Sequence, residues 1–97
     1  MAKAVETLDC AVFVHPWDMS REERVQKYWF PWLLGMPHET AIAMGSLLMG
    51  GVLERHPKLR ICFAHGGGCF PGLIGRVSHG FNARPDLCQL ASKCDPK

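Results

Sequence analysis

The chain has 97 residues, which suits one small domain, and its 47% apolar content with near-zero mean hydropathy excludes a disordered or fibrous protein. The formal charge is only +2, and the dispersed lysines and arginines exclude a basic stripe for nucleic acid or for an anionic membrane. No apolar run approaches the roughly 20 residues of a membrane span, and the first residues do not form a signal-peptide core, so we expect a cytosolic protein.

The first predicted elements are a short helical segment over residues 2–8 and a strand over about residues 10–15. The strand contains the continuous apolar run Ala11-Val12-Phe13-Val14, which is typical of a parallel strand covered on both faces. It ends at His15, because Pro16 lacks an amide proton and restricts the residue before it to extended backbone. The sequence therefore predicts a buried strand with a histidine at its carboxyl end.

Residues 16–35 predict a loop that is much longer than the usual connection of about 2–6 residues. Its charged middle, residues 21–28, is compatible with a short helix. The loop is rich in aromatic side chains, namely Trp17, Tyr28, Trp29, Phe30 and Trp32. Insertions of this kind are commonly lids or binding loops, so the aromatic side chains either pack against the protein or a partner subunit, or form a wall of a substrate site.

A helix is predicted over about residues 37–55, because Pro37 suits the first helical position and Glu39 the first turn. The helix should end before Pro57. Its apolar residues cover more than one stripe, so it either packs between the sheet and its neighbours or also faces another subunit. His56 suits a helix C-terminus as a solvated partner of the helix dipole.

A second apolar run, over about residues 59–65, ends at His65 and is followed by the glycines of residues 66–68. These glycines permit backbone angles and a close ligand approach that side chains would block. Two buried strands separated by a helix form a βαβ unit, which places His15 and His65 on the same edge of the sheet. Ligands of α/β folds gather at this edge, so both histidines are candidate functional residues.

A second helix is predicted over about residues 71–83, and Arg76 and His79 fall within one turn of it. Arg76 is either an ordinary surface arginine or a group that binds a carboxylate through both arms of its guanidinium. His79, like His38 in the preceding helix, is expected to be structural or exposed. Residues 85–97 lack periodicity and predict a loop that is cut short.

The five cysteines form no C-x-x-C pair, so neither a zinc knuckle nor a redox motif is indicated. Cys10 and Cys62 lie in apolar stretches and are expected to be small buried side chains.

Catalytic zinc sites use nitrogen and carboxylate ligands and leave one position for water. His15 and His65 are therefore either both metal ligands, or one is a ligand and the other a general base. Two ligands are too few for such a site, and the chain has no H-x-H pair and no aspartate at the end of a recognisable strand. We expect the site to be incomplete within this chain.

Three segments carry a resemblance to a known family: Phe13–Met19, Tyr28–Pro37, and Phe63–Gly68 continuing to Arg76. They resemble the aminocarboxymuconate-semialdehyde decarboxylases of the metal-dependent amidohydrolase superfamily, over about residues 5–87. The resemblance implies an α/β fold that is a partial (β/α)8 barrel of the amidohydrolase type, with about two βα units and an aromatic-rich inserted loop. The family's first-strand H-x-H ligands and its late-strand aspartate are absent, so the 97 residues are expected to be an internal part of one barrel domain.

For the matching positions, the resemblance implies a zinc cofactor with His15 as a ligand and His65 as the catalytic base. It also implies that Arg76 binds a substrate carboxylate in the neighbouring subunit's site of a homodimer, and that Trp32 lines the pocket. The implied activity is a non-oxidative decarboxylation in cytosolic tryptophan–kynurenine catabolism, which diverts a small-molecule intermediate from quinolinate formation.

Other functions stay open from the sequence. The same fold would suit another amidohydrolase-type hydrolase or an aromatic-acid decarboxylase. A non-catalytic product that associates with full-length subunits, and a stand-alone small α/β domain, are further alternatives. Because a partial barrel leaves sheet edges uncovered, the isolated chain is expected to be poorly folded and inactive.

Overall fold

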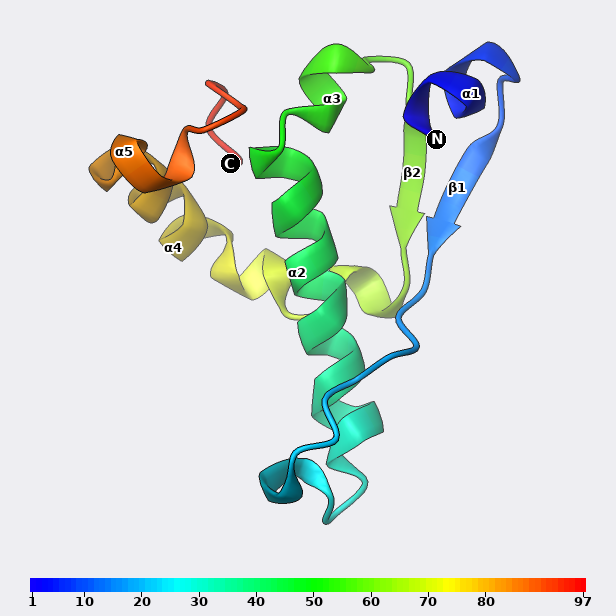
Figure 1. Ribbon diagram of the computed structural model, residues 1–97, viewed down its shortest axis with the longest axis vertical. Helices are drawn as coiled ribbons and strands as arrows, with labels where there is room; N and C mark the ends of the chain where they lie inside the picture. The colour runs from blue at the N-terminus through cyan, green and yellow to red at the C-terminus, as the bar shows by residue number, and fades with distance from the viewer.

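A two-stranded parallel sheet carries the residues of interest in the computed structural model, which describes residues 1–97. Strand β1 (Ala11–Val14) pairs with β2 (Arg60–Phe63), so that Ala11 lies opposite Arg60 and Val14 opposite Phe63. The Ala64 amide donates to the Val14 carbonyl at 2.9 Å and continues the pairing to the strand ends. The parallel pairing confirms the predicted βαβ arrangement, in which the helix between the strands returns the chain to the start of β2 (Figure 1).

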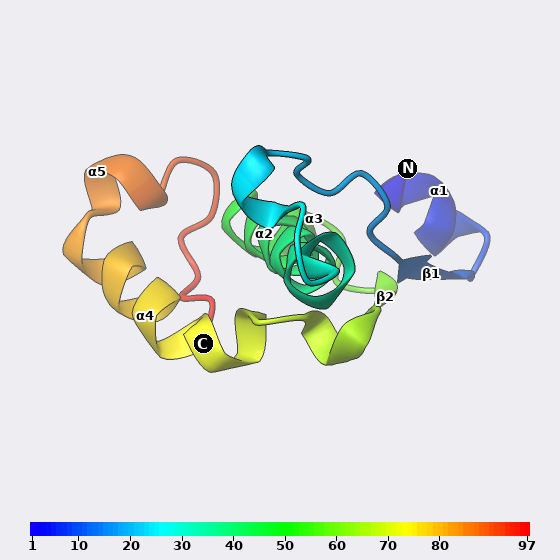
Figure 2. The ribbon, with the colours of Figure 1, turned by 90° about the horizontal axis from the view of Figure 1, so that it is seen from below.

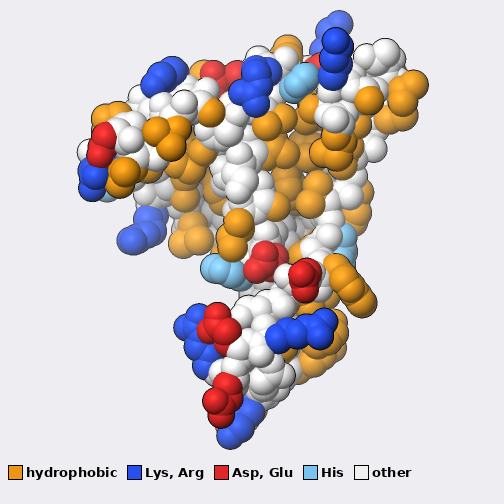
Figure 3. Space-filling model, viewed as in Figure 1, with side chains coloured by type: hydrophobic (Ala, Val, Ile, Leu, Met, Phe, Trp, Pro, Cys, Tyr) orange, Lys and Arg blue, Asp and Glu red, His pale blue; other side chains and the backbone are white.

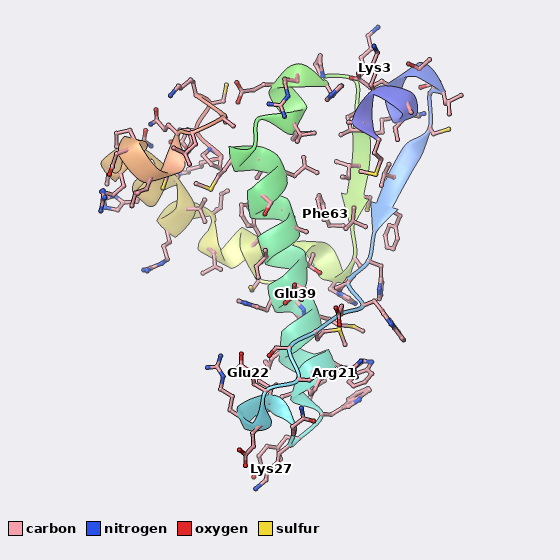
Figure 4. All side chains as sticks on the ribbon, viewed as in Figure 1. Lys3, Arg21, Glu22, Lys27, Glu39 and Phe63 are labelled. Carbon is pink, nitrogen blue, oxygen red and sulfur yellow. The ribbon has the colours of Figure 1, made fainter.

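The sheet is covered on one face, and the expectation of two covered faces is wrong for this chain. Ile61 and Phe63 are half-buried and face the helix that connects the strands, and Figure 4 shows Phe63 pointing into the space between them. Alternate residues point the other way, and Phe13 is 66% exposed. Cys62 lies on this open face and Cys10 precedes the strand, so both are exposed rather than buried.

The connecting helix packs loosely on the sheet. A cavity of about 240 Å³ lies between them, and its lining is entirely apolar: Met44, Leu47, Leu48, Leu53, Ile61 and Phe63. The space-filling view shows apolar side chains gathered in the upper half of the molecule (Figure 3). The radius of gyration is 14.9 Å, whereas a compact domain of this length would have roughly 12.5 Å. The elements are therefore arranged around the helix as a flat, open assembly (Figure 2).

The predicted helix over residues 37–55 is two helices, α2 (Met36–Met49) and α3 (Val52–Arg55). Gly51 separates them with φ of 66°, a left-handed conformation that ends a helix and that favours glycine. A Cβ on Gly51 would also lie 3.1 Å from the Ala91 carbonyl oxygen, so a side chain here would push away the C-terminal segment.

No helix in the structure combines the length and apolar character that crossing a membrane requires.

Residues 16–35 are folded onto the start of α2 rather than forming a plain loop. They contain a 3-10 turn, η1 (Glu23–Val25), and a π-helical segment, η2 (Pro31–Gly35), which runs directly into α2 (Figure 1). Met19 is 8% exposed, and a Cβ on Gly35 would lie only 3.1 Å from the Met19 Cβ. This close approach holds the segment after β1 against η2.

Helix α4 (Phe70–Ala83) and the short α5 (Pro85–Cys88) lie on the other side of α2 from the two strands (Figure 1). The predicted loop over residues 85–97 is wrong at its start, because Pro85–Cys88 form α5. Side chains of the remaining residues contact the helices at two points. Ser92, which is 1% exposed, donates a hydrogen bond to Glu54 on α3. Asp95 accepts a hydrogen bond from the Ser78 hydroxyl at 2.8 Å. The C-terminal segment therefore ties α4 to α3.

Replacing Phe81 with alanine is expected to lower the free energy of unfolding by about 3–5 kcal/mol. Phe81 is the most deeply buried large side chain at 1% exposed, so its removal leaves a cavity beneath α4. Chemical denaturation of the complete protein measures the change. The Phe81→Leu variant removes fewer atoms and should lose less stability, and equal losses for the two variants would contradict the cavity explanation.

Helix α1 (Ala2–Thr7) is attached to the turn before β2 by one carboxylate. The His56 Nδ1–H group donates to Glu6 Oε2 at 3.0 Å, and the Lys58 amide donates to Glu6 Oε1 at 2.9 Å. The position of His56 at a helix end predicted a solvated partner of the helix dipole. This prediction is wrong, because the His56 ring is bonded to Glu6. The hydrogen bond from His56 holds the pKa of Glu6 below its ordinary value of 4.5, and the Lys58 amide lowers it further.

We expect the Glu6→Gln variant to unfold at a lower temperature than the parent protein at pH 7, and the difference to shrink in acid. The folded state depresses the pKa of Glu6, so its contribution is complete above the ordinary value of 4.5 and is lost as the pH falls through the lower folded value. Melting temperatures of both proteins at pH 7 and pH 3 test this. A difference that is constant with pH would contradict it.

Candidate active site at the strand ends

His15 and His65 lie side by side at the carboxyl ends of the paired strands. His15 directly follows the last residue of β1, and His65 comes two residues after the last residue of β2. Because Val14 pairs with Phe63, the two strands end at the same level of the sheet. The imidazole centroids are 5.0 Å apart and the ring planes are inclined at 63°. Both residues are exposed. The structure thus brings together the two histidines that the strand pattern placed on one edge of the sheet.

The His15 ring has a defined tautomer. Its Nδ1 lies 2.7 Å from the carbonyl oxygen of Pro16. Because a carbonyl oxygen can only accept, Nδ1 carries the proton and Nε2 of the neutral ring keeps its lone pair. Histidine ligands of metals are commonly oriented in this way, with one ring nitrogen donating to a carbonyl and the other on the metal. The chemistry of His15 therefore fits a metal ligand.

The backbone at His65 is held by the glycines that follow it. His65 has a positive φ of 55°. The three glycines that follow also have positive φ, between 59° and 83°, a backbone region that glycine adopts without strain. A Cβ on Gly68 would overlap the Pro37 carbonyl in the first turn of α2, with the Pro37 carbon 3.0 Å away. The Cys69 amide donates to the same carbonyl at 3.4 Å. The loop bearing His65 is therefore seated on the start of α2.

The two histidines alone are too few for a catalytic metal site. No group of three or more histidine, cysteine, aspartate or glutamate side chains in the structure is arranged to hold a metal ion. His15 supplies a suitable nitrogen, and His65 is close enough to serve either as a second ligand or as a base beside a metal. The structure brings no further histidine, cysteine, aspartate or glutamate side chain to the pair to complete such a group.

Trp32 lies in η2 and faces a pocket of about 290 Å³ that it shares with Trp17, Met19, Arg21, Gln26 and Pro31. Its ring stacks on Trp29, with centroids 6.0 Å apart and planes inclined at 17°. Trp17 comes two residues after His15, but neither His15 nor His65 lines this pocket. Sequence reasoning missed Arg21 as a pocket residue, because it begins a run of charged residues that is typical of a solvated surface.

Arg76 lies apart from this arrangement. It is exposed on α4, which leads away from the strand ends (Figure 1), and it makes no ion pair. Within one copy of the chain, the structure does not bring Arg76 to the histidine pair. His38 and His79 are exposed on α2 and α4, as expected.

Comparisons with known proteins show which family the chain is similar to. An amidohydrolase family model matches residues 1–93. The chain is 55% identical over 92 residues to 2-amino-3-carboxymuconate-6-semialdehyde decarboxylase of Dictyostelium discoideum, which covers 95% of this chain and 26% of the relative. The enzyme of the same name from Caenorhabditis elegans is 60% identical, covering 92% of this chain and 22% of the relative. A gamma-resorcylate decarboxylase of Rhodococcus jostii is 34% identical, covering 77% of this chain and 24% of the relative.

A solved structure shows the same fold. The crystal structure of 5-carboxyvanillate decarboxylase from Sphingomonas paucimobilis superposes with a TM-score of 0.79 at 21% identity, covering 98% of this chain and 30% of that one. The predicted fold class, a partial (β/α)8 barrel, is thereby confirmed. The chain spans about a quarter of the length of the first two relatives. Because the family model matches nearly all of its residues, the chain belongs to the amidohydrolase family.

Proposed function

We propose that the chain forms part of a zinc-dependent decarboxylase that converts 2-amino-3-carboxymuconate 6-semialdehyde to 2-aminomuconate 6-semialdehyde. The observation that carries the proposal is the pair of histidines at the strand ends, 5.0 Å apart between ring centroids, in a chain 55–60% identical to two enzymes of that name. The more distant decarboxylases, which are named for aromatic acids, match at 32–35% identity.

In this proposal the two histidines have different roles. His15 holds the metal through Nε2, because its Nδ1–H is engaged by the Pro16 carbonyl. When bound, zinc would supply Lewis-acid polarisation and would make a bound water easier to deprotonate. His65 is the general base, and its position on a glycine loop leaves space for a substrate beside it. In the overall reaction the carbon that loses carbon dioxide takes up a proton in its place.

Two further residues bind the substrate in this proposal. Trp32 forms a wall of the aromatic pocket, where its stacking on Trp29 supports a flat conjugated ligand. Arg76 binds a carboxylate through its guanidinium in the site of a neighbouring subunit of a homodimer. Its exposure and its lack of an ion pair support this role. We place the activity in cytosolic tryptophan–kynurenine catabolism, where it would limit the formation of quinolinate.

Release of carbon dioxide by the complete, zinc-loaded protein tests the proposal. The substrates to compare are 2-amino-3-carboxymuconate 6-semialdehyde and the aromatic acid 2,6-dihydroxybenzoate, with an amide or ester substrate as the test of a hydrolase. We expect kcat/KM to be highest for the muconate semialdehyde. Faster turnover of the aromatic acid would favour an aromatic-acid decarboxylase, and hydrolysis without decarboxylation would contradict the proposal.

A further inference from the structure

A methionine of α2 packs against the loop that carries His65. A Cβ on Gly67 would lie 3.1 Å from the Met44 sulfur and 3.4 Å from Pro71 Cγ in the first turn of α4. Gly67 is buried and has φ of 83°, so its backbone passes closely between these two side chains. Because Gly67 has no side chain of its own, the groups packed against it fix its position. Met44 is the group that α2 supplies.

Met44 lies on a firmly packed part of α2. Thr40, one helical turn earlier on the same face, is 1% exposed, and its hydroxyl donates to the Met36 carbonyl at 2.9 Å. One residue after Met44, a Cβ on Gly45 would lie 3.6 Å from the Phe70 ring, which is buried. The helix is therefore in contact with the start of α4 directly beside Met44.

The same side chain also faces the strand that leads to His65. Met44 lines the apolar cavity between α2 and β2 together with Ile61 and Phe63. His65 follows Phe63 by two residues and precedes Gly67 by two residues. Met44 therefore packs near the chain on both sides of His65.

We propose that Met44 is a positioning residue for His65. It packs against Gly67 and faces β2, and in this way it fixes the 3-10 turn η3 (His65–Gly67) that carries the imidazole. Its unbranched thioether is long and flexible enough to fill the space against a glycine backbone, which a shorter side chain would leave empty. The proposal rests on the proposed function in one respect, namely that His65 acts as the base.

Steady-state kinetics of the complete, zinc-loaded protein test this role. Met44→Ala removes the group packed against Gly67, so we expect kcat to fall about 10- to 100-fold, the loss that a displacement of about 1 Å at a base can cause. KM should stay within about threefold of the parent value, because no group that binds the substrate is removed. Met44→Leu keeps most of the side-chain volume and should restore kcat to within about threefold of the parent value.

Leu47→Ala is the matched control. Leu47 lines the same cavity from the same helix, whereas the side chains nearest to a Cβ on Gly67 are those of Met44 and Pro71. Both alanine variants lose apolar volume beside β2 and should unfold at a lower temperature, but Leu47→Ala should keep the parent kcat. All proteins are assayed well below their melting temperatures. A parent-like kcat in Met44→Ala, or equal losses of kcat in the two alanine variants, would overturn the proposal.

Hydrogen exchange of the backbone amides, measured without substrate, separates this proposal from the proposed function. The Gly67 amide donates to the Ala64 carbonyl at 3.1 Å and the Gly68 amide to the His65 carbonyl at 2.9 Å, so both amides report on η3. Met44→Ala should raise their exchange rates about 10-fold, and Leu47→Ala should leave them unchanged. If exchange rises in this way but the protein does not decarboxylate the semialdehyde, the proposed function fails and the role of Met44 in holding the turn stands. If the protein decarboxylates the semialdehyde and Met44→Ala keeps the parent exchange rates and kcat, the Met44 proposal fails alone.

Discussion

Replacing His65 with asparagine is expected to lower kcat of the complete, zinc-loaded protein by about 10²- to 10⁴-fold, the usual contribution of a general base. Asparagine removes the imidazole but tolerates the left-handed backbone of this position, where φ is 55°. The fold of the glycine loop should therefore survive the change. A melting temperature close to that of the parent protein, measured on the same sample, would show that the loss is chemical and not structural.

His38→Asn is the control for this experiment. His38 is exposed at the start of α2 and has no role in the proposed chemistry, so kcat should stay at the parent value. A His65→Asn variant that kept a kcat within a few-fold of the parent would rule out His65 as the base. The pair would then have to be interpreted as two ligands, which the geometry of His15 and His65 also allows.

A methyl group on Gly68 is expected to lower kcat about 100-fold, although this residue touches no substrate in the proposed site. The Gly68→Ala side chain would overlap the Pro37 carbonyl, and its backbone, with φ of 64° and ψ of −133°, is one that alanine rarely adopts. Either the loop or the first turn of α2 must move. A displacement of about 1 Å at a catalytic group can cost a factor of this size, and the strain should also lower the melting temperature.

Gly72→Ala is the matched control for Gly68→Ala. Gly72 lies within α4, and a Cβ there would meet no atom within 4 Å. Alanine in a helix interior is favoured over glycine by roughly 1 kcal/mol, so this variant should be slightly more stable and fully active. If Gly68→Ala kept the kcat and the melting temperature of the parent, the contact between the His65 loop and Pro37 would have no part in positioning His65.

The local sequence pattern was sufficient to predict the two strands and the position of a histidine at the end of each. The apolar runs before His15 and His65 are short and continuous, and Pro16 and Gly66 mark their ends, so the βαβ unit followed from pattern alone. The break in the connecting helix was not predicted, because glycines at 50 and 51 are tolerated inside a helix unless one of them turns left-handed. At Gly51 the chain lies close to the C-terminal segment at Ala91, and this contact joins residues 40 apart in the chain.

Contacts between distant residues also explain what the sequence could not indicate about the site. In the sequence, Arg21 is one of several charged residues that are typical of a surface. Only the fold of residues 16–35 onto α2 places Arg21 in the pocket, while Arg24 pairs with Glu22. The sequence predicts only that His56 lies at a helix end, because it is the position of α1 that brings Glu6 to His56. The open face of β1, with Phe13 exposed, depends in the same way on which elements lie over the sheet.

The zinc content of three forms of the complete protein distinguishes a ligand role for His15 from a base role for His65. Each form is loaded with zinc, dialysed and analysed for metal per chain. We expect His15→Ala to lose the metal, because it removes the imidazole whose tautomer the Pro16 carbonyl fixes, and His65→Asn to keep as much zinc as the parent. Full zinc content in His15→Ala, or an equal loss in both variants, would contradict it.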